Sequence, residues 1–201
     1  YFNDVIKLKK IYKKPNNEEK NALAFAKQHY GAKVRQDTGR TYLHHCLEVS
    51  RLIHKYKYSE KFVIAGLLHD ILEHTDVTYE ELENKFGSEV AEIVSGVTED
   101  PDPTLTWNAR KVKYIQSISN ASEGVLVVSA VDRYHNAVEI LQDWLKIGDS
   151  IFIRYEVGKE QQKWFYRSLT ELYFVKGLFY ENKALLSFSE KIAEVLSHMD
   201  M

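Results

Sequence analysis

Proline, which interrupts helices more strongly than other residues, occurs at only three of the 201 positions: 15, 101 and 103. The stretches 16–100 and 104–201 therefore contain no proline, and both are rich in residues of high helix propensity. Apolar residues recur along them at helical spacing. We therefore predict an all-α protein, and a chain of this length favours one compact domain.

Apolar periodicity and capping residues divide the chain into segments that we expect to be helical. The expected helices cover about 18–29, 45–56, 60–73, a segment that begins at 78, 88 to about 100, 107–119, 125 to beyond 141, and two more within 154–198 that separate near 182. The run 125–131 is rich in β-branched residues and could form a strand. We interpret it as a buried helix because 132–136 continues it to Ile140 and Leu141 at helical spacing.

Charge and composition exclude several classes of protein. The 27 basic and 29 acidic residues nearly balance, so we expect no nucleic-acid partner. No run of about 18 apolar residues predicts a membrane span, and the N-terminal residues lack the pattern of a signal peptide. The single cysteine, Cys46, excludes an internal disulfide, and we interpret it as a packing residue. We therefore expect a cytoplasmic protein.

One helix ends in a cluster of ionisable residues. The segment predicted over 60–73 is apolar for two turns and then presents His69, Asp70, Glu73 and His74. On a continuous helix, His69 and Glu73 share one face and Asp70 and His74 a second. Buried charge is costly unless it is paired or bound to a metal. The alternative is that the helix simply emerges into solvent with two surface histidines.

His45 and Asp132 add to this cluster, because each lies in or beside an apolar helical run. Together with His69 and Asp70 they supply two imidazoles and two carboxylates from three predicted helices. Such donors with open coordination positions suit a six-coordinate Mn²⁺, Fe²⁺, Co²⁺ or Mg²⁺ better than closed structural zinc. We therefore predict a metal site between helices.

The series His45, His69-Asp70 and Asp132 resembles the metal-dependent HD-domain phosphohydrolases. Longer segments resemble the hydrolase domain of Rel/Spo-type alarmone enzymes and their stand-alone small relatives: 35–37, 42–45, 67–75, 86–87, 97–99, 129–136 and 158–169. The match runs in family order over about 22–175. It implies a single HD-type hydrolase domain over 1–201, built as a helical bundle, with C-terminal helices at about 154–198.

The resemblance also implies roles for individual residues. The implied metal ligands are His45, His69, Asp70 and Asp132, around one divalent ion, Mn²⁺ first, with Fe²⁺, Co²⁺, Mg²⁺ or Zn²⁺ as alternatives. The implied catalytic residues are Glu73 and His74, and the implied substrate contacts are Arg35, Lys111, Asn136 and Lys159. The chain departs from the family pattern at His74, where an acid is usual, and at Gln36 and His44. An imidazole at 74 can still accept a proton.

The implied reaction is hydrolysis of the 3′-pyrophosphate of a guanosine alarmone, (p)ppGpp, to GDP or GTP and pyrophosphate. We see no synthetase module and expect a hydrolase only. The alternatives are an HD phosphohydrolase acting on an adenosine alarmone, NADPH or an ordinary nucleotide; a non-catalytic relative that binds a nucleotide or a partner protein; and a structural domain in which the cluster is accidental. The aromatic-rich segment 164–180 is core or an interface, so a homo-oligomer stays open.

Overall fold

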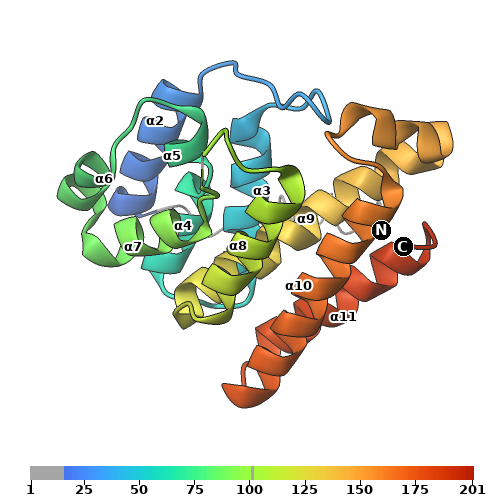
Figure 1. Ribbon diagram of the computed structural model, residues 1–201. Coiled ribbons are helices and arrows are strands. Elements are labelled where there is room, and N and C mark those ends of the chain that lie inside the picture. The colour runs from blue at the N-terminus through green and yellow to red at the C-terminus, as the bar shows by residue number, and fades with distance from the viewer. Residues whose placement is uncertain (1–15, 101) are drawn as a thin grey trace.

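The computed structural model describes residues 16–100 and 102–201, and within them the chain is almost entirely helical (Figure 1). The elements are α2 (Asn17–Tyr30), α3 (Tyr42–Lys55), α4 (Glu60–Leu68), α5 (Ile71–His74), α6 (Tyr79–Phe86), α7 (Ser88–Val97), α8 (Trp107–Ser119), α9 (Glu123–Ile147), the 3₁₀ helix η1 (Gly148–Arg154), α10 (Lys159–Phe179) and α11 (Lys183–Ser197). The N-terminal segment, where the sequence shows no signal-peptide pattern, lies outside the described residues.

The all-α prediction is confirmed. Over the described ranges, β structure is limited to one isolated bridge between Val34 and Thr41. The β-branched run 125–131 lies inside the 25-residue helix α9, where all its residues are buried. Helical continuity thus overrides the strand propensity of the isolated run. None of the helices in the described part of the chain is long and apolar enough to cross a membrane.

Short polar side chains define where several helices begin. Asn16 and Glu19 form a reciprocal capping box at α2, with Asn16 Oδ1 accepting from the Glu19 backbone N–H at 2.9 Å. Thr41 caps α3 by accepting from the backbone N–H of His44 at 3.2 Å. The Asn182 side chain accepts from two backbone N–H groups at the start of α11. The last two helices therefore separate near residue 182, as predicted.

The helix predicted over 60–73 is interrupted, which corrects the prediction of a continuous segment. Helix α4 ends at Leu68, Asp70 adopts φ −91° and ψ 0°, and the single turn α5 starts at Ile71. Successive side chains on a continuous helix point about 100° apart. On a continuous helix, the side chains of His69 and Asp70 would therefore point in different directions. Both reach the same cluster because the backbone leaves the helical conformation at these residues. His69 is therefore buried whereas Glu73 is exposed, and the two do not share one helical face.

Helix α9 forms the centre of the packing and contacts α3, α4, α7 and α11. Its N-terminal half is buried on all sides, as expected for a helix apolar around its circumference. Beside α9, helices α3 and α4 approach each other closely at Gly66. A Cβ at this position would overlap the Cδ1 of Ile53. The small residue at 66 thus brings the helices that carry His45 and His69 together.

Helices α10 and α11 lie side by side as an antiparallel pair along one flank of the molecule (Figure 1). The aromatic-rich segment 164–180 divides between core and surface. Its buried members are Phe165, Tyr166, Leu169 and Tyr173, whereas Phe174, Val175, Leu178 and Phe179 are exposed. The hypothesis that the segment is core therefore holds for one face of α10 and not for the other.

Candidate metal centre and adjoining cavity

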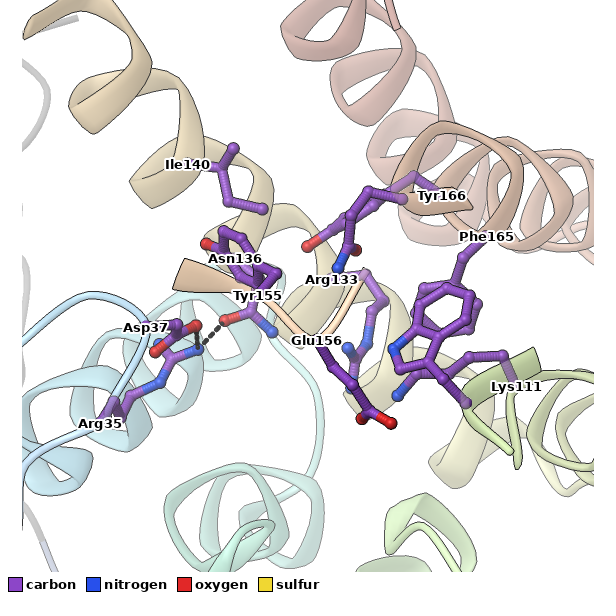
Figure 2. A pocket seen from close by; sticks show the side chains of 12 residues that line it. Arg35, Asp37, Lys111, Arg133, Asn136, Ile140, Tyr155, Glu156, Phe165 and Tyr166 are labelled. Atoms are coloured by element: carbon purple, nitrogen blue, oxygen red, sulfur yellow. Dashed lines mark hydrogen bonds and ion pairs between the residues drawn. The ribbon is translucent and has the colours of Figure 1, made fainter. Parts of the chain in front are cut away.

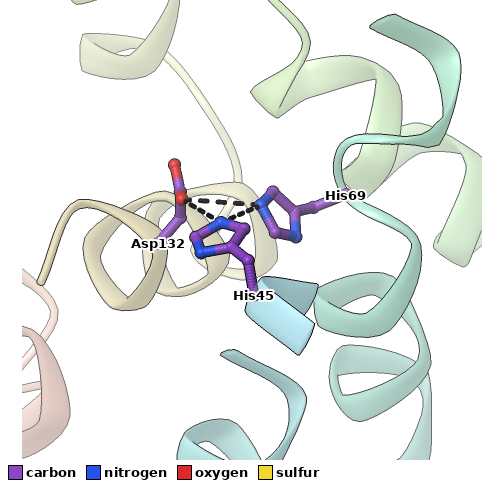
Figure 3. A group of neighbouring side chains, drawn as sticks. All are labelled: His45, His69 and Asp132. Atoms are coloured by element: carbon purple, nitrogen blue, oxygen red, sulfur yellow. Dashed lines mark hydrogen bonds and ion pairs between the residues drawn. The ribbon is translucent and has the colours of Figure 1, made fainter. Parts of the chain in front are cut away.

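Three buried side chains, from helices α3 and α9 and from the turn that follows α4, meet at one point (Figure 3). The Nε2 atom of His45, on α3, lies 3.2 Å from Nε2 of His69 and 3.0 Å from Oδ1 of Asp132, on α9. Asp70 completes the group, with its Oδ1 3.3 Å from His69 Nε2 and its Oδ2 3.9 Å from His45 Nε2. The four ligands predicted from the sequence are thus assembled.

The far sides of the two imidazole rings are held by acceptors. His69 Nδ1 lies 2.9 Å from the carbonyl oxygen of Gly66, which can only accept, so Nδ1 carries a proton and Nε2 is the atom that faces the cluster. His45 Nδ1 lies 2.8 Å from Nδ1 of His135. Metal-binding histidines commonly donate their second N–H in this way, which orients the ring.

Burial and charge set the protonation of the cluster. Burial lowers the pKa of His45 to about 4, which keeps its imidazole neutral. Burial disfavours the charge of Asp132, but the Arg133 guanidinium and hydrogen bonds from His45 and His69 outweigh it and hold the pKa of Asp132 well below its usual range. Burial likewise opposes charge on His69, yet the carboxylate of Asp70 raises its pKa. The carboxylates therefore stay ionised and favour a cation between them.

This donor set fits a divalent cation. Histidine nitrogens and carboxylate oxygens are ligands for Mn²⁺, Fe²⁺, Co²⁺ and Zn²⁺, and the ligand atoms of His45, His69 and Asp132 lie within 4.8 Å of one another. All three residues are at least 96% buried, because their exposed fractions are 1%, 3% and 4%. A cation would offset charge that is otherwise costly to bury. Which metal binds is not fixed by these donors.

Glu73 and His74 lie at the edge of the cluster, on the single turn α5. Partial desolvation of the carboxylate, together with the negative charge of Asp70, raises the pKa of Glu73. The Nε2 atom of His74 is 3.8 Å from Oε1 of Glu73, and its ring lies 4.3 Å from that of Tyr42. The two predicted catalytic residues are therefore neighbours on a short element, and their roles stay predictions.

A cavity of about 200 Å³ adjoins the cluster, between α9, α8 and the start of α10 (Figure 2). Its lining combines cations, carboxylates and aromatic rings: Arg35, Asp37, Trp107, Lys111, Arg133, Asn136, Ile140, Tyr155, Glu156, Gln162, Phe165 and Tyr166. Arg133 connects the cavity to the cluster through a 2.8 Å ion pair with Asp132. A small polar ligand with aromatic and anionic parts would match this lining.

Arg35 and Asn136 lie together on one wall of the cavity. The Nη2 of Arg35 donates to Asn136 Oδ1 at 2.7 Å, and its Nη1 pairs with Glu139 at 2.6 Å. Asn136 Nδ2 donates in turn to Asp132 Oδ1 at 2.8 Å. A continuous chain of contacts thus runs from Arg35 to a metal ligand, as expected if both residues contact one substrate.

The two lysines predicted to bind substrate have different positions. Lys111 lines the cavity, where its Nζ pairs with Glu99 and lies 4.9 Å from the Phe165 ring centroid. Burial lowers its pKa. Lys159 instead pairs with Asp149 at 3.1 Å and is not part of the cavity lining. The structure therefore brings Lys111 to the site and leaves Lys159 outside it.

Sequence reasoning missed several residues of the site. His135 and Glu139 follow Asp132 at helical spacing on α9, so their position could have been predicted once α9 was placed. Trp107 and Phe165 carried no signal, because an aromatic residue in a helix is more often core than cavity wall. Arg133 lies in the segment 129–136 that resembles the family, but the sequence assigned it no role, although it lines the cavity.

Comparison with known proteins gives matches of several kinds. A guanosine-3′,5′-bis(diphosphate) 3′-pyrophosphohydrolase of Aquifex aeolicus is 41% identical over 95 residues, which cover 47% of this chain and 14% of that protein. The enzyme of the same name from Danio rerio, MESH1, is 34% identical over 113 residues, 55% of this chain and 62% of that one. The chain thus spans a small part of the long bacterial relatives.

A solved structure shares the fold over nearly the whole length. It is described as a metazoan ortholog of SpoT that hydrolyses ppGpp, and it aligns with a TM-score of 0.70 and 21% identity over 93% of this chain and 98% of that one. A family model described as HD domain matches residues 22–138, more than half of the chain. The extent of a single hydrolase domain over 1–201 stays a prediction. The chain therefore belongs to the HD domain family.

Proposed function

We propose that this protein is a metal-dependent phosphohydrolase that removes the 3′-pyrophosphate of a guanosine alarmone, (p)ppGpp, and leaves GDP or GTP. The observation that carries the proposal is the junction of two sites: the cluster of His45, His69, Asp70 and Asp132 is joined by the Arg133–Asp132 ion pair to a cavity lined by cations and aromatic rings. Relatives that bear the name of this activity support it.

The cluster would hold one divalent cation, with Mn²⁺ as the expected ion. When bound, such a cation supplies Lewis-acid stabilisation to the phosphoryl oxygens. Glu73 accepts the proton of the attacking water, a role that its raised pKa favours because a stronger base takes the proton more readily. His74, beside Glu73, is placed to share or relay that proton.

The cavity residues position the substrate. Arg133 lines the cavity and pairs with Asp132 through one guanidinium nitrogen, so its charge is placed to attract a phosphate oxygen. Lys111 adds a second cation, and the rings of Trp107 and Phe165 line the same part of the cavity. Phosphoryl transfer depends mainly on such positioning and charge stabilisation.

On the opposite wall, Asn136 would contact the sugar and Arg35 would pack against the base or meet a phosphate. The contacts of Arg35 with Glu139 and Asn136 fix the plane of its guanidinium, which lowers the entropy cost of either role. The single Cys46 is buried against Asp70 and needs no partner thiol, which fits a cytoplasmic enzyme.

The test is a metal-reconstitution assay. The purified protein is stripped with chelator, supplied with ppGpp with and without Mn²⁺, and followed by pyrophosphate release. Release that depends on Mn²⁺ is the expected result. Parallel assays contain ppApp, NADPH and ordinary nucleotides, and preferred turnover of one of these would replace the guanosine substrate. Tight binding of ppGpp without turnover, with metal present, would favour a non-catalytic binder.

A further inference from the structure

His45 contacts a second histidine on the side that faces away from the metal ligands. Its Nδ1 lies 2.8 Å from Nδ1 of His135, and the ring centroids are 4.9 Å apart. His135 lies one turn beyond Asp132 on α9 and is about 13% exposed. One face of α9 thus provides a metal ligand and, three residues later, a group that touches another ligand.

The chemistry of imidazole fixes the direction of this hydrogen bond. A neutral imidazole has one N–H, and when the cluster holds a cation, Nε2 of His45 must offer its lone pair to that cation rather than a proton to Asp132, 3.0 Å away. The proton of His45 therefore resides on Nδ1 and is donated to Nδ1 of His135. His69 has the same arrangement, with the Gly66 carbonyl as acceptor at 2.9 Å.

A second cation between His45, His135 and Glu139 is the competing interpretation, since their donor atoms also lie within 4.8 Å of one another. The carboxylate of Glu139 is already engaged. Its Oε2 pairs with Arg35 at 2.6 Å and its Oε1 lies 3.5 Å from Arg40, whereas His135 Nδ1 is 3.9 Å from Oε2. The guanidinium charges at this carboxylate oppose a cation there, so the His45–His135 contact is a hydrogen bond.

We propose that His135 is a positioning residue, which accepts a hydrogen bond from His45 Nδ1–H and thereby sets the affinity of the HD-domain metal site for its cation. The inference rests on the metal-binding part of the proposed function and not on the identity of the substrate. Partners of this kind change metal affinity by about 10–100-fold when they are removed.

The experiment compares Mn²⁺ binding to three variants without substrate. His135→Leu removes the acceptor and keeps similar bulk. His135→Asn restores an acceptor, because the Asn Oδ1 takes a position close to that of His Nδ1. His198→Leu is the matched control, since His198 is exposed beyond α11. Free Mn²⁺ is measured by electron paramagnetic resonance during titration, and circular dichroism melting checks the fold of each variant.

The expected result is an Mn²⁺ Kd raised about 10–100-fold in His135→Leu, with His135→Asn and the control close to the wild type. An unchanged Kd in His135→Leu would overturn the proposal, and so would equal loss in the Leu and Asn variants. Binding of two Mn²⁺ per chain, with one lost in His135→Leu, would show a second cation site instead.

If His135→Leu fails to fold, His135→Asn is compared with His135→Gln. The acceptor of Gln is displaced from the Nδ1 position, so we expect a weaker Mn²⁺ affinity in the Gln variant than in the Asn variant. None of these results depends on turnover of ppGpp, so the two proposals fail separately.

Discussion

The metal-ligand cluster and the cavity beside it are built in different ways. His45, His69 and Asp132 are almost completely buried, lie on α3, at the end of α4 and on α9, and contact one another at 3.0–3.5 Å. The cavity wall instead combines residues of α8, α9, α10 and two loops that range from buried to exposed, and several of its charges take part in ion pairs. The residues of the cluster thus contact one another directly, whereas the residues of the cavity wall come from separate elements.

We infer from this difference that the cluster supports the chemical step and that the cavity wall binds the substrate. The rings of the predicted ligands His69 and His45 contact Gly66 and His135, which preorganises them, so we expect the loss of any one ligand to affect cation binding and every later step. A wall formed by independent side chains contributes binding energy in smaller parts. Substitutions in the cluster should therefore abolish turnover, whereas substitutions in the wall should change KM.

Asp70→Asn should have the largest effect. The amide lacks the charge that favours a cation and removes the carboxylate that faces His69 and His45, so we expect loss of bound metal and of pyrophosphate release. Metal content by mass spectrometry and the ppGpp assay measure both. Asp76→Asn, at an exposed position shortly after α5, is the matched control. Full metal content with normal turnover in Asp70→Asn would contradict the ligand assignment.

Glu73→Gln should come next, and it should separate metal binding from proton transfer. Because Glu73 lies on the exposed edge of the cluster, the variant should retain its metal while kcat falls by about 10²-fold or more. Glu80→Gln, on the exposed face of α6, controls for the loss of one carboxylate. A variant that loses metal together with activity would show that Glu73 is a ligand.

The same contrast explains how much could be predicted from the sequence. The cluster was predictable because His45, His69, Asp70 and Asp132 interrupt or end apolar helical runs, where an ionisable residue needs a partner. The break between α4 and α5 could not be predicted, because helix propensity depends on local sequence. The turn at Asp70 instead accompanies the tertiary contacts that bring His69 and Asp70 to the same cluster.

The cavity wall was predicted only in part. Arg35, Lys111 and Asn136 were expected there, and Lys159 was expected but pairs with Asp149 outside it. The aromatic members depend on how α8 and α10 pack against each other, and periodicity does not contain that information. Lys111 and Lys159 are both partly buried, and local sequence does not distinguish the lysine that lines the cavity from the one that pairs outside it.

Lys111→Met tests the wall, with a smaller expected effect. Removal of one charge-assisted contact should raise the KM for ppGpp about tenfold and leave metal content and kcat nearly unchanged. Lys113→Met is the matched control, because Lys113 lies on the same helix, pairs with Asp100 and faces solvent. A fall in kcat without a change in KM would indicate that Lys111 acts in the transition state only.

His74→Asp should have the smallest effect and tests the boundary between the two regions. A carboxylate beside Glu73 adds like charge, which should raise the pKa of Glu73 further and make it a stronger base. We expect kcat to increase by roughly two- to fivefold at neutral pH, in line with Brønsted behaviour, with metal affinity unchanged. His74→Asn is the control, since it removes the ring contact with Tyr42 without adding charge. If both variants lower kcat alike, the imidazole of His74 itself handles the proton. Acid–base chemistry would then be shared between two neighbours of α5 rather than assigned to Glu73 alone.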